Sequence, residues 1–125
     1  MSAALTAIVC DDAPGFQVLM AATLKEVGLN VVATGATWAE AERLAEQRPD
    51  VIVCDLWMPL FDDQALARIR AACPDATLAV VTALTLVDAA EQVATAGVDL
   101  LLSKSSPPTE VAAEIAEHAR GRRAG

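Results

Sequence analysis

The side chains best suited to chemistry stand where short apolar runs of the sequence end. Asp11 and Asp12 follow the first such run, and Asp55 follows the third. Thr82 ends the fourth run, and Lys104 comes just after the fifth. If these runs are parallel strands, their carboxyl ends meet at one edge of a sheet, where ligands of such folds bind. Three carboxylates, one hydroxyl and one ammonium are therefore expected to converge.

The chemistry of such a cluster is restricted by its charge. Neighbouring carboxylates raise one another's pKa values and need positive charge beside them. Lys104 supplies one charge, and a hard divalent cation with oxygen ligands, of which Mg²⁺ is the natural choice, supplies two more. Together these groups form a receptor for a transferring phosphoryl group, which Asp55 attacks in line. Helix capping is the alternative role for Asp11 and Asp12, but it requires no acid at Asp55.

Five short apolar runs, rich in Val, Ile and Leu, are expected to form the sheet. They show continuous apolarity rather than alternation, which is typical of strands covered on both faces, as in parallel sheets. The predicted strands are residues 6–10, 30–34, 51–54, 77–82 and 99–102.

Longer alanine-rich stretches between these runs show the spacing of amphipathic helices. Thr37, with Glu40 three positions later, forms a capping-box pattern. Gly28 and Gly97 are expected to end helices. The helices are predicted to begin near Pro14, Thr37, Asp63, Thr85 and Pro107. Five strands alternating with five helices predict a single doubly wound α/β domain with helices on both faces of the sheet.

The same spacing predicts which helical side chains face the sheet. In the first helix these are Phe16, Leu19, Met20, Leu24 and Val27, and in the third Leu66, Ile69 and Ala72. In the fourth helix they are Val87, Ala90, Val93 and Ala94, and in the fifth Val111, Ala112, Ile115 and Ala119.

Composition narrows the classes of function. The 125 residues are 54% apolar and 21% charged, which fits one globular domain. We expect the domain at residues 1–120, with 121–125 as a polar tail or the start of a linker. A formal net charge of −8 argues against direct binding to nucleic acid or to an anionic membrane. No apolar run approaches the length of a membrane span, and the first residues do not resemble a signal peptide.

Three cysteines without a C-x-x-C pair favour neither a disulfide framework nor a zinc site, and a reducing cytoplasm is the expected compartment. Cys10 and Cys54 are expected to be buried neighbours that point away from the acids. His118 and the arginines at 120, 122 and 123 are expected to form a solvated helix end. Trp57 and Phe61 are expected either to contact a partner or to pack locally over the site.

The sequence resembles the receiver domain of bacterial two-component response regulators over essentially its whole length. The residues that carry the resemblance are Asp11-Asp12, the stretch from Asp55 to Pro59, Thr82-Ala83 and Ser103-Lys104. The stretch after Lys104 looks most like receivers that precede a helix-turn-helix output domain, because Ser105 replaces the usual proline. The resemblance implies a flavodoxin-like fold, with a five-stranded parallel sheet in the order 2-1-3-4-5 and five flanking helices.

The resemblance also implies roles at the site. Asp55 would accept the phosphoryl group. Asp12, Asp55 and the backbone carbonyl of Trp57 would hold Mg²⁺, and Asp11 would hold the metal's waters. Lys104 would contact the phosphoryl group.

A second set of implied roles concerns switching. Thr82 would swing its hydroxyl toward the phosphorylated aspartate. Its usual aromatic partner position is Leu101 here, and Asp63 stands where the family often has glycine. Trp57 and Leu84 occupy positions that flank the attacking water, and their bulk predicts a long-lived phosphorylated state.

These residues favour a signalling module rather than an enzyme that turns over an external metabolite. It would take its phosphoryl group from a sensor histidine kinase or a phosphotransfer protein and control an output, with transcription expected. A homodimer is compatible with this function. A flavin carrier is disfavoured because Asp11 and Asp12 would repel its phosphate, and an aspartyl phosphatase would need an acid where Trp57 stands. The remaining alternative is a phosphorylation-independent, receiver-like interaction module.

Overall fold

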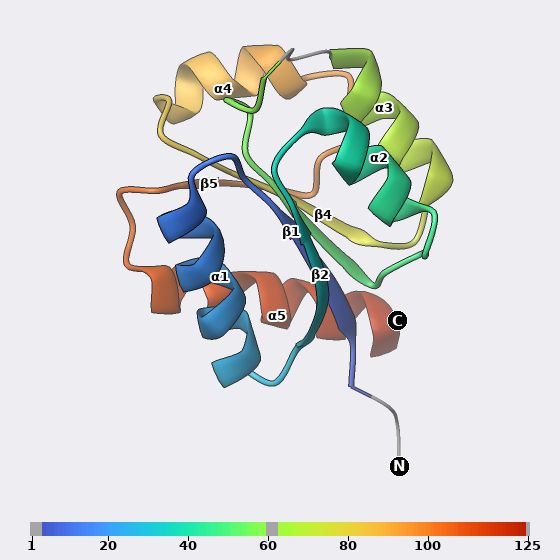
Figure 1. Cartoon of the computed structure of the whole chain (residues 1–125), viewed down its shortest axis with the longest axis vertical. Coiled ribbons are helices and arrows are strands. Elements are labelled where there is room, and N and C mark those ends of the chain that lie inside the picture. Colours follow the sequence, from blue (N-terminus) through green and yellow to red (C-terminus); the bar gives the residue numbers. More distant parts are fainter. Residues whose placement is uncertain (1–3, 60–62, 125) are drawn as a thin grey trace.

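Strands and helices alternate strictly along the chain. The computed structural model describes residues 4–59 and 63–124 (Figure 1). Its strands are parallel and lie in the order β2-β1-β3-β4-β5, which confirms the order that the resemblance implied. The strands are β1 (Thr6–Cys10), β2 (Asn30–Gly35), β3 (Val51–Cys54), β4 (Thr77–Thr82) and β5 (Leu100–Ser103).

Five helices cover both faces of this sheet. Helices α1 and α5 pack together on one face, and α2, α3 and α4 lie on the other (Figure 1). Crossover connections between parallel strands place successive helices in this way. The helices are α1 (Pro14–Glu26), α2 (Trp38–Ala45), α3 (Asp63–Ala72), α4 (Leu86–Val93) and α5 (Pro108–Ala124).

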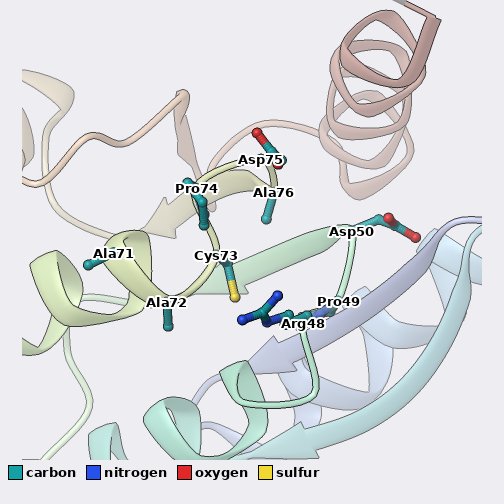
Figure 2. Close-up of a pocket in the computed structure, with 9 residues that line it drawn as sticks. All are labelled: Arg48, Pro49, Asp50, Ala71, Ala72, Cys73, Pro74, Asp75 and Ala76. Carbon is teal, nitrogen blue, oxygen red and sulfur yellow. The ribbon is translucent and has the colours of Figure 1, made fainter.

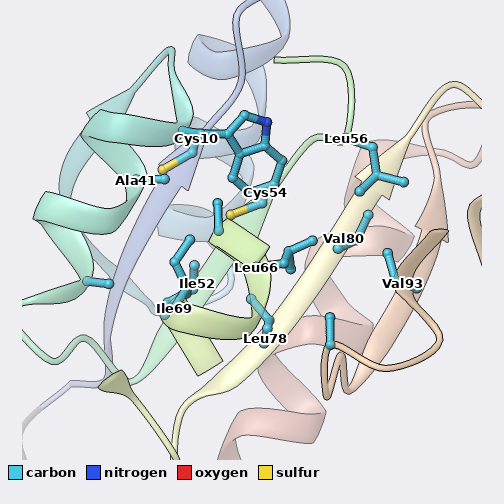
Figure 3. Packing of buried hydrophobic residues seen from close by; sticks show 14 of the residues in the cluster. Cys10, Ala41, Ile52, Cys54, Leu56, Leu66, Ile69, Leu78, Val80 and Val93 are labelled. Carbon is cyan, nitrogen blue, oxygen red and sulfur yellow. The ribbon is translucent and has the colours of Figure 1, made fainter. Parts of the chain in front are cut away.

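The three central strands are buried on both faces, as their continuous apolarity predicts. Alternate residues of each strand point to opposite cores. Ile8, Ile52 and Leu78 face the core under α2–α4, part of which is shown in Figure 3. Their neighbours Val9 and Val53 face the core under α1 and α5. Burial on both sides fixes the strand register and therefore fixes where each strand ends.

The predicted capping residues begin two helices. Thr37 Oγ1 accepts a hydrogen bond from the Glu40 backbone N–H at 3.1 Å, and Glu40 accepts in return from the Ala36 N–H at 3.3 Å. Thr85 Oγ1 accepts from the Asp88 N–H at 3.3 Å at the start of α4. These caps satisfy backbone donors that a helix leaves unpaired.

Helix α4 buries Val93 as predicted but otherwise turns a different face inward. Its buried side chains are Ala89 and Val93, and Val87 is 73% exposed. Ala90 and Ala94, also expected inside, are exposed. In this eight-residue helix, the adjacent alanines Ala89 and Ala90 lie on neighbouring faces, so the apolar pattern alone does not decide which of them turns inward. Leu19 of α1 and Ala72 of α3 were likewise predicted inside and are exposed.

The pole opposite the acids is held by charged side chains rather than left in solvent. Helix α5 continues through residues 121–124, the stretch expected as a tail. Arg122 pairs with Asp99 at 3.1 Å, and Asp99 also pairs with Arg70. The prediction of a solvated His118 is wrong, since its Nδ1 lies 3.0 Å from the hydroxyl of buried Thr77. Ion pairs and hydrogen bonds therefore join α3, α5 and the loop before β5 at the end of the sheet opposite the site.

In the part of the chain that the structure describes, no helix is long and apolar enough to cross a membrane.

Candidate functional site

The carboxyl edge of the sheet collects the polar residues that follow its strands. Asp11 follows β1 and Asp55 follows β3, and these strands are neighbours in register, with Cys10 opposite Cys54. The Asp55 N–H donates to the Cys10 carbonyl at 3.0 Å, so the backbone itself places the two acids side by side.

Three carboxylates meet at this edge. Side-chain oxygens of Asp11, Asp12 and Asp55 all lie within 4.8 Å of one another. Asp11 and Asp55 are each only 2% exposed, whereas Asp12 is exposed. Burial of two adjacent carboxylates is unfavourable unless positive charge compensates.

Lys104 supplies that compensation from the end of β5. Its Nζ lies 2.8 Å from Asp11 Oδ2 and 3.3 Å from Asp55 Oδ2. Burial acts to lower the pKa of Lys104, but hydrogen bonding and attraction from Asp11 and Asp55 outweigh it and raise the pKa. The ammonium therefore stays charged between the two acids.

Asp55 remains electrostatically strained despite this lysine. Its burial and the negative charge of Asp11 raise its pKa, against the lowering effect of Lys104 and of a hydrogen bond from the Trp57 backbone. One lysine therefore does not neutralise two buried carboxylates, and the pocket can take up more positive charge.

Two buried carboxylate oxygens have no aligned hydrogen-bond donor among the described residues. They are Asp11 Oδ2, which has only its ion pair with Lys104, and Asp55 Oδ1. The other Asp11 oxygen accepts from the Ala13 N–H at 2.8 Å. Carboxylate oxygens are the ligands that a hard divalent cation prefers, so Asp55 Oδ1, together with the nearby carboxylate of exposed Asp12, fits Mg²⁺. The role of the Trp57 backbone carbonyl as a further Mg²⁺ ligand stays a prediction.

Thr82 ends β4 and is fully buried at this edge. Its hydroxyl accepts a hydrogen bond from the Leu84 N–H at 3.2 Å, and its carbonyl accepts from the Lys104 N–H at 2.8 Å. Leu84 and Leu101 are half-buried and pack against the core under α2–α4. Among the described residues, the Thr82 hydroxyl is therefore held by the Leu84 N–H of the following loop.

Two residues at the start of α1 complete the site and were not predicted there. Phe16 was expected only as a core side chain, but Lys104 Nζ lies 4.3 Å from the centre of its ring. Gln17 Nε2 donates to the carbonyls of Asp11 at 3.1 Å and Gly35 at 2.8 Å, which ties the loop after β1 to the end of β2. Both stand in the first turn of α1, a few residues after the acids, and this closeness in sequence was the available signal.

Trp57 is 58% exposed, so its side chain lies at the surface beside the site. Phe61 lies outside the described residues.

Cys10 and Cys54 are free and fully buried, as expected (Figure 3). Hydrogen bonding to Cys10, burial and nearby negative charge raise the pKa of the Cys54 thiol well above its usual value. These thiols are core side chains rather than nucleophiles.

A pocket of about 370 Å³ opens at the opposite pole (Figure 2). Arg48, Asp50, Cys73 and Asp75 are among its lining residues. The Cys73 sulfur lies 3.1 Å from the Ala45 carbonyl, and burial raises its pKa despite nearby Arg48. The described residues that line this pocket provide no convergent set of catalytic groups, so the acidic edge is the better functional site.

Comparison with known proteins identifies relatives along nearly the whole chain. The response regulator receiver domain family matches residues 7–116. A curated relative is the protein-glutamate methylesterase/protein-glutamine glutaminase 3 of Hahella chejuensis (strain KCTC 2396), which is 33% identical over 106 residues. The match covers 82% of this chain but only 30% of that protein.

Solved structures share the fold. The receiver domain of the response regulator NarL from Mycobacterium tuberculosis is 27% identical, with a TM-score of 0.85 and coverage of 96% of this chain and 99% of that one. A CheY-like receiver domain protein from Methanospirillum hungatei JF-1 has a TM-score of 0.86 at 18% identity, covering 97% of this chain and 98% of that one. A LuxR-family regulator from Aurantimonas sp. SI85-9A1 is 27% identical, with a TM-score of 0.80 and coverage of 96% and 88%.

The strain at Asp55 predicts that Asp55→Asn stabilises the metal-free protein at neutral pH. A carboxyl whose pKa is higher in the folded state stabilises the fold only while protonated, so stability falls as pH rises from the unfolded through the folded pKa. The amide removes that loss, and Lys104 keeps Asp11 as its partner. We expect a melting temperature a few degrees above wild type at pH 7.

The melting temperature, measured at a series of pH values from acid to neutral in the absence of divalent cations, tests this effect. Asp75→Asn, an exposed carboxylate at the opposite pole, is the control and should change little. A lower melting temperature for Asp55→Asn than for wild type at pH 7 would contradict the expectation.

Proposed function

The chain belongs to the response regulator receiver domain family, and from this premise we propose that it accepts a phosphoryl group on Asp55 to control a signalling output. The observation that carries the proposal is the pairing of buried Asp55 with a second buried acid and with the Lys104 ammonium at 3.3 Å. Family members use such a pocket for phosphoryl transfer.

In the proposed reaction, an Asp55 carboxylate oxygen attacks the phosphorus of a phosphohistidine on a sensor kinase or phosphotransfer protein. The new oxygen–phosphorus bond forms as the phosphorus–nitrogen bond breaks, and the donor imidazole leaves. Lys104 neutralises charge on the phosphoryl oxygens during transfer. Burial of Asp55 keeps water away from the acyl phosphate that results.

Mg²⁺ is the cofactor that these donors fit. Asp12, Asp55 and the Trp57 carbonyl would hold it directly, and Asp11 would hold its waters. When bound, it supplies the positive charge that two buried carboxylates and an incoming phosphoryl group require. With Asp11 facing the metal's waters, Lys104 would be available to the phosphoryl oxygens.

The proposed switch begins at Thr82. Thr82 Oγ1 accepts from the Leu84 N–H, so its own O–H can donate to another group. A phosphoryl oxygen on Asp55 would be a strong, charged acceptor for that O–H, and we propose that the hydroxyl turns from Leu84 toward it. Leu101 on β5 then repacks into the space that the side chain leaves. The face formed by α4, β5 and α5 changes, and it already exposes Leu86 and Val87 to a partner or a second copy.

Transcription is the output we propose. The Lys104-Ser105 sequence is like that of receivers that precede a helix-turn-helix domain, and regulators of the LuxR family from Aurantimonas and Staphylococcus aureus share the fold. The negatively charged receiver would act on DNA through an output domain, in the cytoplasm. The methylesterase activity in the relative's name is not proposed for this chain, which spans 30% of that protein.

Intact-mass spectrometry after incubation with Mg²⁺ and a small acyl phosphate tests the proposal. Wild type should gain one phosphoryl group, because Asp55 is the buried nucleophile beside Lys104. Asp55→Asn, and wild type without divalent cation, should gain none. Folded wild type that gains no phosphoryl group from this donor or from a purified histidine kinase would favour the phosphorylation-independent interaction module instead.

The side chains beside the acceptor predict a slow loss of the phosphoryl group. Trp57 and Leu84 are apolar and cannot orient an attacking water, whereas an amide at position 57 can. Trp57→Asn should therefore speed the decay of the phosphorylated form several-fold, measured by intact mass over time. Leu86→Asn, an exposed residue of α4, is the control. Equal decay of wild type and Trp57→Asn would show that Trp57 does not limit access of water.

A further inference from the structure

Phe16 lies under the ammonium of Lys104. The Nζ atom is 4.3 Å from the ring centre, within the range of a cation–π contact. We propose that Phe16 is a positioning residue, whose ring holds the Lys104 ammonium over the acidic pocket and so sets the affinity of the site for a phosphoryl group. This inference rests on the proposed phosphoryl-accepting function.

The burial of the pair makes the contact effective. The Lys104 side chain is only 17% exposed, so little water competes for its charge. Phe16 is half-buried, and its body packs against the core under α1 and α5. Cation–π attraction strengthens as the cation loses water. The ring therefore serves two roles, anchoring α1 to the core and presenting its face to the ammonium.

The neutral ring of Phe16 is also the contact of Lys104 that a metal ion and a phosphoryl group would leave unchanged. Lys104 otherwise contacts Asp11 and Asp55, and both change their electrostatic environment when a metal ion and a phosphoryl group enter. A lysine has a flexible stem, and it would be free to leave the pocket as these partners are engaged elsewhere. An aromatic face beneath it limits that loss of position.

The rest of this core is aliphatic, which supports a specific use for the ring. Phe16 is the one aromatic side chain among the described residues of the core under α1 and α5. Leu and Met fill the comparable positions, such as Leu24 and Met20 of the same helix. If the position required only an apolar side chain to fill the core, an aliphatic residue would serve as well as an aromatic one.

The contact is tested first by NMR of the metal-free protein. The Lys104 methylene protons nearest the ammonium should be shifted upfield by the ring current in wild type, and this shift should vanish in Phe16→Leu. Wild type without such a shift would overturn the proposal, whatever the function of the protein.

The role is tested by the affinity for beryllofluoride, a phosphoryl mimic, in the presence of Mg²⁺. Phe16→Leu should bind it roughly three- to tenfold more weakly, the loss that a cation–π contact at a partly buried site predicts. Phe16→Tyr should recover most of the affinity. Met20→Leu, a volume-conserving change in the same core, should bind as wild type does.

Ring-fluorinated phenylalanines at position 16 separate the π-face from the shape of the side chain. Successive fluorination weakens the ring's attraction for a cation with little change in shape, so affinity should fall with each fluorine. Thermal unfolding checks that every variant is folded. Equal affinity across the fluorinated series would overturn the positioning role.

Failure of the proposed function gives a distinct result. In that case wild type would show the ring-current shift yet neither bind beryllofluoride nor take up a phosphoryl group. That outcome would overturn both the phosphoryl-accepting function and the role of Phe16 in it.

Discussion

The close approach of two buried carboxylates is the constraint on which the rest of this molecule depends. Parallel pairing of β1 with β3 sets Cys10 opposite Cys54, so Asp11 and Asp55 must lie side by side where both strands end. One ammonium, that of Lys104, lies between them at 2.8 and 3.3 Å. Burial and repulsion from Asp11 still raise the pKa of Asp55, so additional positive charge at this edge would be stabilising.

The two ends of the sheet differ in how their charged side chains are held. At the acidic edge, Thr82 and Lys104 make contacts that new charge on Asp55 can exchange for others. At the opposite pole, Asp99 is held by the backbone of Leu78 at 2.8 Å and by Arg122, and α5 is tied to the sheet. In the switch that we propose, a charge change at the acidic edge would move loops and helix faces while the sheet stays held at the opposite pole.

Much of this architecture was predictable from sequence, because strand ends and helix caps are local signals. Continuous apolar runs placed Asp11, Asp55 and Thr82 at one edge, and Thr37 with Glu40 marked the start of α2. The inward face of α4 was not fully predictable, because the adjacent Ala89 and Ala90 leave the apolar stripe of this short helix ambiguous. The contact of His118 with Thr77 and that of Lys104 with Phe16 join segments far apart in sequence, which periodicity along one segment cannot reveal.

The most direct test of the central claim is fluorine NMR of the protein with beryllofluoride and Mg²⁺. If Asp55 and Lys104 form a metal-dependent receptor for a phosphoryl group, wild type should give resonances of bound beryllofluoride. These signals should vanish when Mg²⁺ is withheld or when Asp55 is replaced by asparagine. A folded wild-type protein that shows no bound resonance at saturating Mg²⁺, or an Asp55→Asn variant that keeps it, would contradict the claim.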